Sequence, residues 1–172
     1  MKQLKVNCQG RKQFRAEVST SGAIHHVNLV GLKGLCVECA ERYLVYDCMP
    51  HGSLEKHLFQ RKPIDSGLGN EVSNCTRVVN GLAYLHEECR EDIIHCDIKP
   101  ENVLLDADFT PKISDFGPAK LLGRDLNRML TTMRGIRGCI APEWISGIAI
   151  TSKVDVYNYG MMLSEIVSGR RN

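Results

Sequence analysis

Hydrophobic residues recur at helical spacing in three stretches of the chain, and each stretch predicts a helix. In residues 12–20, Phe14 and Val18 stand four positions apart, which places both side chains on one helical face. A second set of apolar residues has the same spacing, and a Gly-Leu-Gly-Asn sequence breaks the pattern before it, so we expect a helix over about 72–88. Residues 151–170 are apolar nearly all round, which is typical of a helix at the centre of a helical layer.

Short apolar runs between these helices predict strands. Residues 1–6 are mixed and strand-like, and residues 43–46 read as a buried strand that runs into a turn. Two further strands, 103–105 and 112–114, flank a turn at 106–108 that is rich in turn-forming residues. Helices and strands together indicate an α+β fold.

The composition is that of a soluble globular domain. The chain has 172 residues, of which 43% are hydrophobic and 24% are charged, as in an ordinary soluble domain with a sizeable core. The net charge of +2 is too balanced to suggest a nucleic-acid or membrane-surface partner, and no apolar run is long enough to span a membrane. The eight cysteines follow no framework spacing, so we expect reduced thiols in a reducing compartment.

The candidate chemistry is concentrated between His95 and Gly117. The two strands of this segment form a hairpin whose ends return to one place, so Asp97, Lys99, Asn102 and Asp115 are expected to converge. An acid beside a hydroxyl nucleophile, together with amide and carboxylate oxygens that suit a hard cation, fits phosphoryl transfer.

This segment resembles the catalytic loop of eukaryotic protein kinases, H-x-D-x-K-x-x-N followed by D-F-G. The matching residues are His95, Asp97, Lys99, Asn102, Asp115, Phe116 and Gly117. The family's next landmarks follow in order, as Ala141-Pro142-Glu143 and Asp155-Val156-Tyr157-Asn158-Tyr159-Gly160. Cys96, where many kinases have Arg, together with T-T-M-R-G and A-P-E-W-I-S-G, resembles the lectin-type (S-receptor-like) plant receptor-like serine/threonine kinases.

The resemblance implies a role for each residue of the loop. Asp97 would accept or orient the hydroxyl proton of a substrate Ser or Thr, and Lys99 would stabilise the transferring phosphoryl group. Asn102 and Asp115 would hold the Mg²⁺ ions that bridge the phosphates of ATP. Asp155 would brace the backbone of the loop from the last helix.

The resemblance also implies a partner for the phosphates near the start of the chain. Lys2, in M-K-Q-L, matches the phosphate-gripping lysine, and Glu17, in F-R-A-E-V, matches the helical glutamate that pairs with it. Fifteen positions separate the two residues, as in plant receptor-like kinases.

The hinge of the nucleotide pocket is matched by L-V-Y-D-C-M-P-H-G-S-L. Tyr46 would guard the back of the pocket, and the backbone of Asp47 and Met49 would bond the adenine edge. Ser53 would lie near the ribose, and Leu104 would form the apolar floor under the adenine.

Length sets the expected extent of the domain. A complete kinase domain takes about 250 residues, so we expect residues 1–172 to form a partial kinase domain. Residues 1–48 would be a remnant of the small lobe without a glycine-rich phosphate loop, and residues 49–172 would be a large lobe that is truncated after its central helix.

Four departures from the family pattern bear on activity. Pro118 follows D-F-G, Ile136 replaces a Thr of the peptide-binding loop, and Cys139 replaces an aromatic residue. Ser21 stands where an apolar residue links the helix to Phe116. Cys96 removes a cationic partner for phosphate, so activity need not depend on phosphorylation at Thr131 or Thr132.

Two functions remain open. The first is a protein serine/threonine kinase that uses Mg-ATP and acts on Ser or Thr hydroxyls of proteins, with weak or no transfer by the chain as it stands. The alternative is a catalytically inactive kinase-like fragment, or pseudokinase, that acts as a binding module. A cytoplasmic location is expected, at the cytosolic face of the plasma membrane if a longer parent is a membrane receptor.

Overall fold

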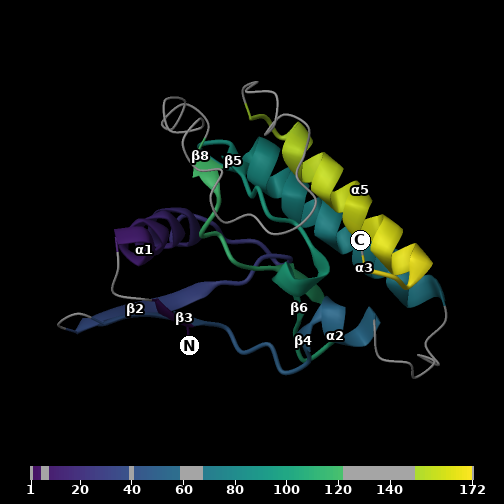
Figure 1. The fold of residues 1–172 in the computed structure, drawn as a ribbon, viewed down its shortest axis with the longest axis horizontal. Helices are drawn as coiled ribbons and strands as arrows, with labels where there is room; N and C mark the ends of the chain where they lie inside the picture. Colours follow the sequence, from purple (N-terminus) through teal and green to yellow (C-terminus); the bar gives the residue numbers. More distant parts are fainter. Residues whose placement is uncertain (1, 5–7, 39–40, 59–67, 122–149, 172) are drawn as a thin grey trace.

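The computed structural model describes residues 2–4, 8–38, 41–58, 68–121 and 150–171. Within these ranges the chain is a mixed α+β fold with three small sheets. Figure 1 shows one sheet with helix α1 on one side of the molecule and two long helices, α3 and α5, on the other. Among the described residues, no helix combines the length and the apolar character needed to cross a bilayer.

The first sheet joins three antiparallel strands in the order β1-β3-β2. The strands are β1 (Lys2–Leu4), β2 (Leu32–Glu38) and β3 (Glu41–Tyr46). Helix α1 (Cys8–Ser21) packs on the sheet through a small cluster in which Phe14 and Leu44 are buried. Because Lys2 lies opposite Leu44 in the register, the strand pairing places Lys2 beside the residues that face α1.

The helical side is built from α3 (Leu68–Ala83), a π-helical turn (Tyr84–Glu88) and α5 (Lys153–Ser168). Figure 1 shows α3 and α5 lying side by side, and the hydroxyl of Tyr159 on α5 donates to the carbonyl of Cys75 on α3 at 3.1 Å. Helix α5 ends at Gly169, whose φ of 62° is the left-handed conformation that glycine adopts without a steric penalty.

Short elements connect the two sides. They are β4 (Gly52–Ser53), α2 (Leu54–Leu58), β5 (Ile93–Ile94), the 3₁₀ turn Pro100–Asn102, β6 (Val103–Leu105), β7 (Pro111–Ile113) and β8 (Lys120–Leu121). Strands β6 and β7 form the expected hairpin, with Val103 opposite Ile113. The ends of this hairpin meet, because Ser114 N–H donates to the Asn102 carbonyl at 2.8 Å.

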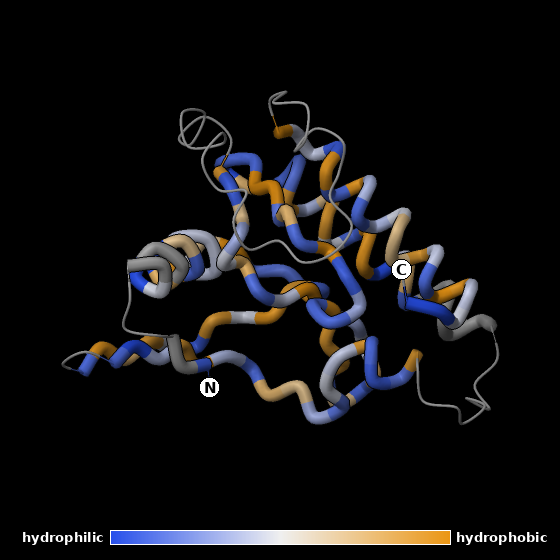
Figure 2. The backbone as a smooth tube through the Cα atoms, in the orientation of Figure 1, coloured by the Kyte–Doolittle hydropathy of each residue, from blue (hydrophilic) through white to orange (hydrophobic). Residues whose placement is uncertain are grey.

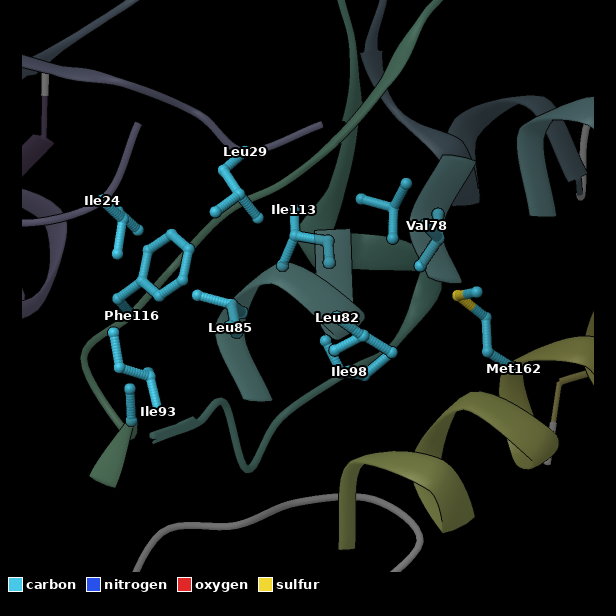
Figure 3. Packing of buried hydrophobic residues seen from close by; sticks show 12 residues of the cluster. Ile24, Leu29, Val78, Leu82, Leu85, Ile93, Ile98, Ile113, Phe116 and Met162 are labelled. Atoms are coloured by element: carbon cyan, nitrogen blue, oxygen red, sulfur yellow. The ribbon is translucent and has the colours of Figure 1, made fainter. Parts of the chain in front are cut away.

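The main core lies between the sheets and the two long helices. Figure 3 shows Phe116 beside Ile24 and Leu85 at one end of the cluster and Met162 of α5 at the other. Phe116, which follows the candidate ligand Asp115, is 1% exposed. The position of the candidate site is therefore fixed by the packing of this core.

Two helices differ from the pattern of the sequence. Helix α3 begins at Leu68, so the expectation of a helix start near residue 72 is wrong. Leu68, Gly69 and Asn70 of the Gly-Leu-Gly-Asn sequence form its first turn. A glycine in a helix costs only about 1 kcal/mol, and the helix recovers this through tertiary packing of its later turns.

Helix α5 is apolar nearly all round in sequence, but among the described residues its burial is confined to one face. Val154, Asp155, Asn158 and Met162 are buried, and their spacing places them on one side of the helix. Val156 and Val167 are 58% and 87% exposed. Figure 2 shows hydrophobic and hydrophilic segments alternating along this helix. Apolar residues on every side of a helix therefore do not tell which faces pack against other elements. Among the described residues, only one face of α5 is packed in this way.

Candidate functional site

The loop that carries Asp97 is held by a buried carboxylate. Asp155, on α5 and fully buried, accepts hydrogen bonds from the backbone N–H groups of His95 and Cys96, both at 2.8 Å. His86, in the π-helical turn, contacts the same carboxylate through Nε2 at 2.8 Å. Cys96 has a φ of 69°, and the two N–H bonds to Asp155 hold this uncommon left-handed backbone in place.

His95 links the loop to the segment that contains Asp115. Its Nε2 lies 3.0 Å from the carbonyl of Ser114, and its Nδ1 accepts the N–H of Asp97 at 3.3 Å. Because one partner is an acceptor and the other is a donor, these bonds select the neutral ring with the proton on Nε2. The edge of the ring packs on Phe116, with the ring centroids 5.1 Å apart.

Asp97, Lys99 and Asn102 form one hydrogen-bonded group. Asp97 Oδ2 accepts from Asn102 Nδ2 at 2.9 Å and pairs with Lys99 Nζ at 2.8 Å. Asn102 Nδ2 also donates to the Asp97 carbonyl at 2.8 Å. One carboxylate oxygen of Asp97, Oδ1, therefore has no donor among the described residues, and the other oxygen is fixed in direction.

A second group brings together residues from the start and the middle of the chain. Lys2 Nζ donates to Glu17 Oε1 at 2.8 Å and to Asp115 Oδ1 at 2.9 Å. Asp115 Oδ1 also accepts the N–H of Gly117 at 3.3 Å. The ammonium of Lys2 thus joins β1, α1 and the D-F-G segment, and the expected pairing of Lys2 with Glu17 is present.

The two carboxylates that share the Lys2 ammonium have pKa values shifted in opposite directions. Burial raises the pKa of Glu17 more than the pairing with Lys2 lowers it. At Asp115 burial acts in the same direction, but the charge and hydrogen bond of Lys2 outweigh it and the pKa is lowered. Burial would lower the pKa of Lys2, yet the charge of Asp115 and the hydrogen bond to Glu17 raise it. The Lys2 side chain therefore stays protonated and the Asp115 side chain stays deprotonated at neutral pH.

The two groups are joined by Ser114. Its N–H and its hydroxyl both donate to the Asn102 carbonyl, at 2.8 and 2.9 Å, and Asp115 is the next residue. Asp115 has a φ of 65°, which turns its side chain away from the regular strand direction. Sequence spacing had predicted that Asp97, Asn102 and Asp115 converge, and hydrogen bonds connect all three segments.

The oxygen atoms that remain suit a hard cation. Among the described residues nothing donates to Asn102 Oδ1 or to Asp115 Oδ2. The described residues contain no group of three or more His, Cys, Asp or Glu that could enclose a metal. Mg²⁺ prefers one or two protein oxygens completed by phosphate and water, and these two residues offer that donor set.

The candidate hinge leaves particular backbone groups available. Asp47 N–H donates to the Gly31 carbonyl at 3.2 Å, and the Met49 carbonyl accepts from Gly52 N–H at 3.1 Å. The Asp47 carbonyl and the Met49 N–H have no partner within the described chain, which is an acceptor and donor pair that matches an adenine edge. Ser53 lies opposite Leu104 in the pairing of β4 with β6.

Two contacts of the site were not anticipated from the sequence. Nothing in the spacing singled out His86, because its only signal is a polar residue within an apolar helical stretch. Tyr46 was expected to stand at the back of the pocket, and the contact that was not anticipated is the hydrogen bond that its hydroxyl donates to Glu17 Oε1 at 3.1 Å. The expectations for Thr131, Thr132, Ile136, Cys139 and Ala141-Pro142-Glu143 lie outside the described residues.

The chain is similar in sequence to known proteins over its whole length. A family model described as "Protein kinase domain" matches residues 1–172. Two G-type lectin S-receptor-like serine/threonine-protein kinases of Arabidopsis thaliana are 60% and 55% identical to the chain; the matches cover 100% of it and 21% and 22% of the relatives. A third, from Oryza sativa subsp. indica, is 48% identical, covering 98% of the chain and 21% of the relative. The chain spans about a fifth of the length of these curated relatives.

Proposed function

The chain belongs to the protein kinase family, and on that premise we propose that it transfers the γ-phosphate of ATP to serine and threonine hydroxyls of protein substrates. The observation that supports this proposal best is the arrangement of Asp97. One of its oxygens is held by Asn102 and Lys99, and the other has no donor within the described chain. A substrate hydroxyl that approaches the second oxygen meets an oriented proton acceptor.

Each neighbouring residue has a distinct part in this proposal. Lys2, held between Glu17 and Asp115, grips the phosphates of ATP, and Lys99 neutralises charge on the group in transfer. Asn102 and Asp115 hold Mg²⁺, which when bound offsets the negative charge of the phosphates. The backbone of Asp47 and Met49 binds the adenine edge.

We extend the proposal to the organisation of the chain. Residues 1–48 are the small-lobe part of a kinase domain and residues 49–172 are the large-lobe part, with Ser53 and Leu104 at the nucleotide between them. The relatives are named receptor-like kinases, which supports a location at the cytosolic face of the plasma membrane within a longer receptor.

Transfer of phosphate from radiolabelled ATP to a generic basic protein tests the activity. We expect slow transfer by the 172-residue chain, reduced a further 10²- to 10⁴-fold in Asp97→Asn, because the general base is removed while the fold is kept. A thermal-shift titration with Mg-ATP provides the control, since a ligand that binds the native state raises its stability in both proteins.

The same pair of measurements separates the alternative function. A chain that is stabilised by Mg-ATP but transfers no phosphate would be a pseudokinase that acts as a binding module. A chain that shows neither stabilisation nor transfer would contradict the kinase function and favour an inactive kinase-like fragment that binds no nucleotide.

A further inference from the structure

The chain that follows helix α5 turns back toward the short elements that carry the candidate site. Gly169 ends the helix in its left-handed conformation, and its N–H donates to the Glu165 carbonyl at 2.9 Å. Arg170 N–H then donates to the Ser168 hydroxyl at 3.3 Å. These bonds reverse the chain after the end of α5 (Figure 1), and Arg171 lies beside α2 as a result.

Arg171 binds two carboxylates that come from different parts of the chain. Its Nη2 donates to Glu55, in the first turn of α2, and to Glu101 Oε1, at 3.1 Å in the second case. Glu101 lies in the 3₁₀ turn Pro100–Asn102, directly before Asn102. The guanidinium therefore joins the end of α5 to α2 and to the turn that carries a candidate Mg²⁺ ligand.

The two carboxylates differ in how firmly their elements are held. Leu54, at the start of α2, packs against the main core, so Glu55 beside it stands on a fixed element. The turn that contains Glu101 is closed by a main-chain bond from Asn102 N–H to the Lys99 carbonyl at 3.0 Å. The bridge through the guanidinium therefore ties this turn to an element that the core holds in place.

The spacing of the two acids requires a cation between them. Two carboxylates that share one nitrogen lie close together, and they repel each other when no cation is present. The lysines nearest to them in sequence point elsewhere, because the Lys56 ammonium lies against Gly52 and Lys99 pairs with Asp97 at 2.8 Å. Within the described part of the chain, Arg171 is the only cation that pairs with both acids.

We propose that Arg171 is a positioning residue, whose guanidinium ties the Pro100–Asn102 turn to α2 and so holds Asn102 in its orientation toward Asp97 and Mg²⁺. The proposal rests on the proposed kinase function, because that function gives Asn102 its role toward Mg²⁺. Arg171 acts through Glu101 and is not assigned any contact with ATP or the metal.

A matched pair of arginine variants tests the proposal. Arg171→Gln removes the charge that joins the two acids. Arg170→Gln makes the same change at the preceding position, whose bonds to Ser168 are made by its main chain. The first measurement is hydrogen exchange, read by NMR, at the N–H groups of Asn102 and Ser114. It follows the opening of the turn and needs neither ATP nor a substrate.

We expect both groups to exchange about two- to fivefold faster in Arg171→Gln. The change is modest because the side chains of the bridge are 29% to 60% exposed, so solvent screens their pairing. Exchange in the main core, as at Leu85, should stay unchanged, and so should every rate in Arg170→Gln. Glu101→Gln should reproduce the effect, and its combination with Arg171→Gln should add little, since both changes break the same bond.

The second measurement is the Mg²⁺ dependence of phosphate transfer. A looser Asn102 predicts an about two- to fivefold higher Mg²⁺ concentration for half-maximal transfer in Arg171→Gln, with kcat unchanged at saturating Mg²⁺. Arg171→Lys should restore most of the wild-type value, because an ammonium can also donate to two carboxylates. A general loss of folded protein would lower kcat instead, so this split is specific to positioning.

The outcomes distinguish the two proposals. Equal exchange in Arg171→Gln and the wild type, or equal acceleration in Arg170→Gln, overturns the role of Arg171 whatever the activity. Faster exchange with an unchanged Mg²⁺ dependence also overturns it, because the turn would then not position Asn102. Absence of transfer in the wild-type chain contradicts the kinase activity, while the exchange rates still decide whether Arg171 holds the turn.

Discussion

The loop that carries Asp97 and the cluster around Lys2 meet at Ser114, but they are held in different ways. The loop is fixed by backbone N–H bonds to Asp155, which is fully buried. The cluster is joined by ion pairs in which the side chains of Lys2 and Asp115 are 31% and 36% exposed. Among the described residues, a core with twelve buried members lies behind the loop, whereas α1 and its sheet share a cluster with two.

The two regions therefore differ in how rigidly they hold their side chains. A buried acceptor with several donors has one low-energy arrangement, so the residues around Asp97 are preorganised. The pair of Lys2 with Asp115 is partly exposed, and such ion pairs contribute little stability. Lys2 and Glu17 lie on β1 and α1, so their contact depends on how closely α1 packs on the sheet. We expect changes at the loop to reduce global stability and changes at the cluster to act locally.

The largest effect is expected from Asp155→Ala. Removing the carboxylate leaves two buried N–H groups and the His86 ring without their acceptor, which costs about 3–5 kcal/mol. Urea unfolding followed by circular dichroism measures this loss. Val156→Ala, the next position on α5 and 58% exposed, is the control and should change stability by no more than about 0.5 kcal/mol. Equal stability of the two variants would show that Asp155 does not brace the loop.

A smaller and more local effect is expected from Leu44→Ala than from Leu85→Ala. Both side chains are 0% exposed, and such truncations cost about 2–5 kcal/mol. The cost should be greater at Leu85, which lies in the larger core. Hydrogen exchange should show faster exchange throughout the chain for Leu85→Ala and only in α1 and β1–β3 for Leu44→Ala. An identical pattern in the two variants would mean that both regions open as one unit.

The smallest effect is expected from Asp115→Asn and depends on pH. Because the pKa of Asp115 is lowered from 3.8, its carboxylate stabilises the fold above that pH, and the contribution is lost as pH falls through the folded-state pKa. The stability difference from the wild type should be less than about 1 kcal/mol at pH 7, since solvent screens a side chain that is 36% exposed.

This difference should begin to shrink as pH falls to about 3.8, the ordinary pKa, and should disappear below the lower pKa of the folded state. Asp108→Asn, in the exposed turn between β6 and β7, is the control, and its unfolding free energy should follow that of the wild type at every pH. A difference for Asp115→Asn that persists in acid would assign the effect to packing rather than to charge.

Sequence spacing predicted much of this arrangement. The β6–β7 hairpin and helix α1 follow from residue types at fixed separations, and the pairing of Lys2 with Glu17 follows from the resemblance to plant receptor-like kinases. All three are present. Such features depend on local geometry or on motifs whose members must act together. The roles of Asp97, Asn102, Asp115 and the hinge residues toward ATP and Mg²⁺ stay predictions.

What spacing did not reveal depends on contacts between distant elements. The bond of His86 to Asp155 joins positions 69 residues apart, and the π-helical turn that presents His86 has no signature in the pattern of apolar residues. The start of α3 at Leu68 and the exposed face of α5 are likewise decided by which surfaces pack together. Hydrophobic periodicity identifies a face, but only the tertiary structure selects its partner.

The left-handed backbone at Cys96 restricts how the sequence can vary there. With a φ of 69° and a side chain that is 2% exposed, the position disfavours residues branched at Cβ, because Val, Ile and Thr collide with their own backbone in that conformation. Glycine, which has no Cβ, avoids this collision, and unbranched residues meet less of it. Substitutions tolerated at position 96 should therefore come from a small set of amino acids, whatever the chemistry of the neighbouring Asp97.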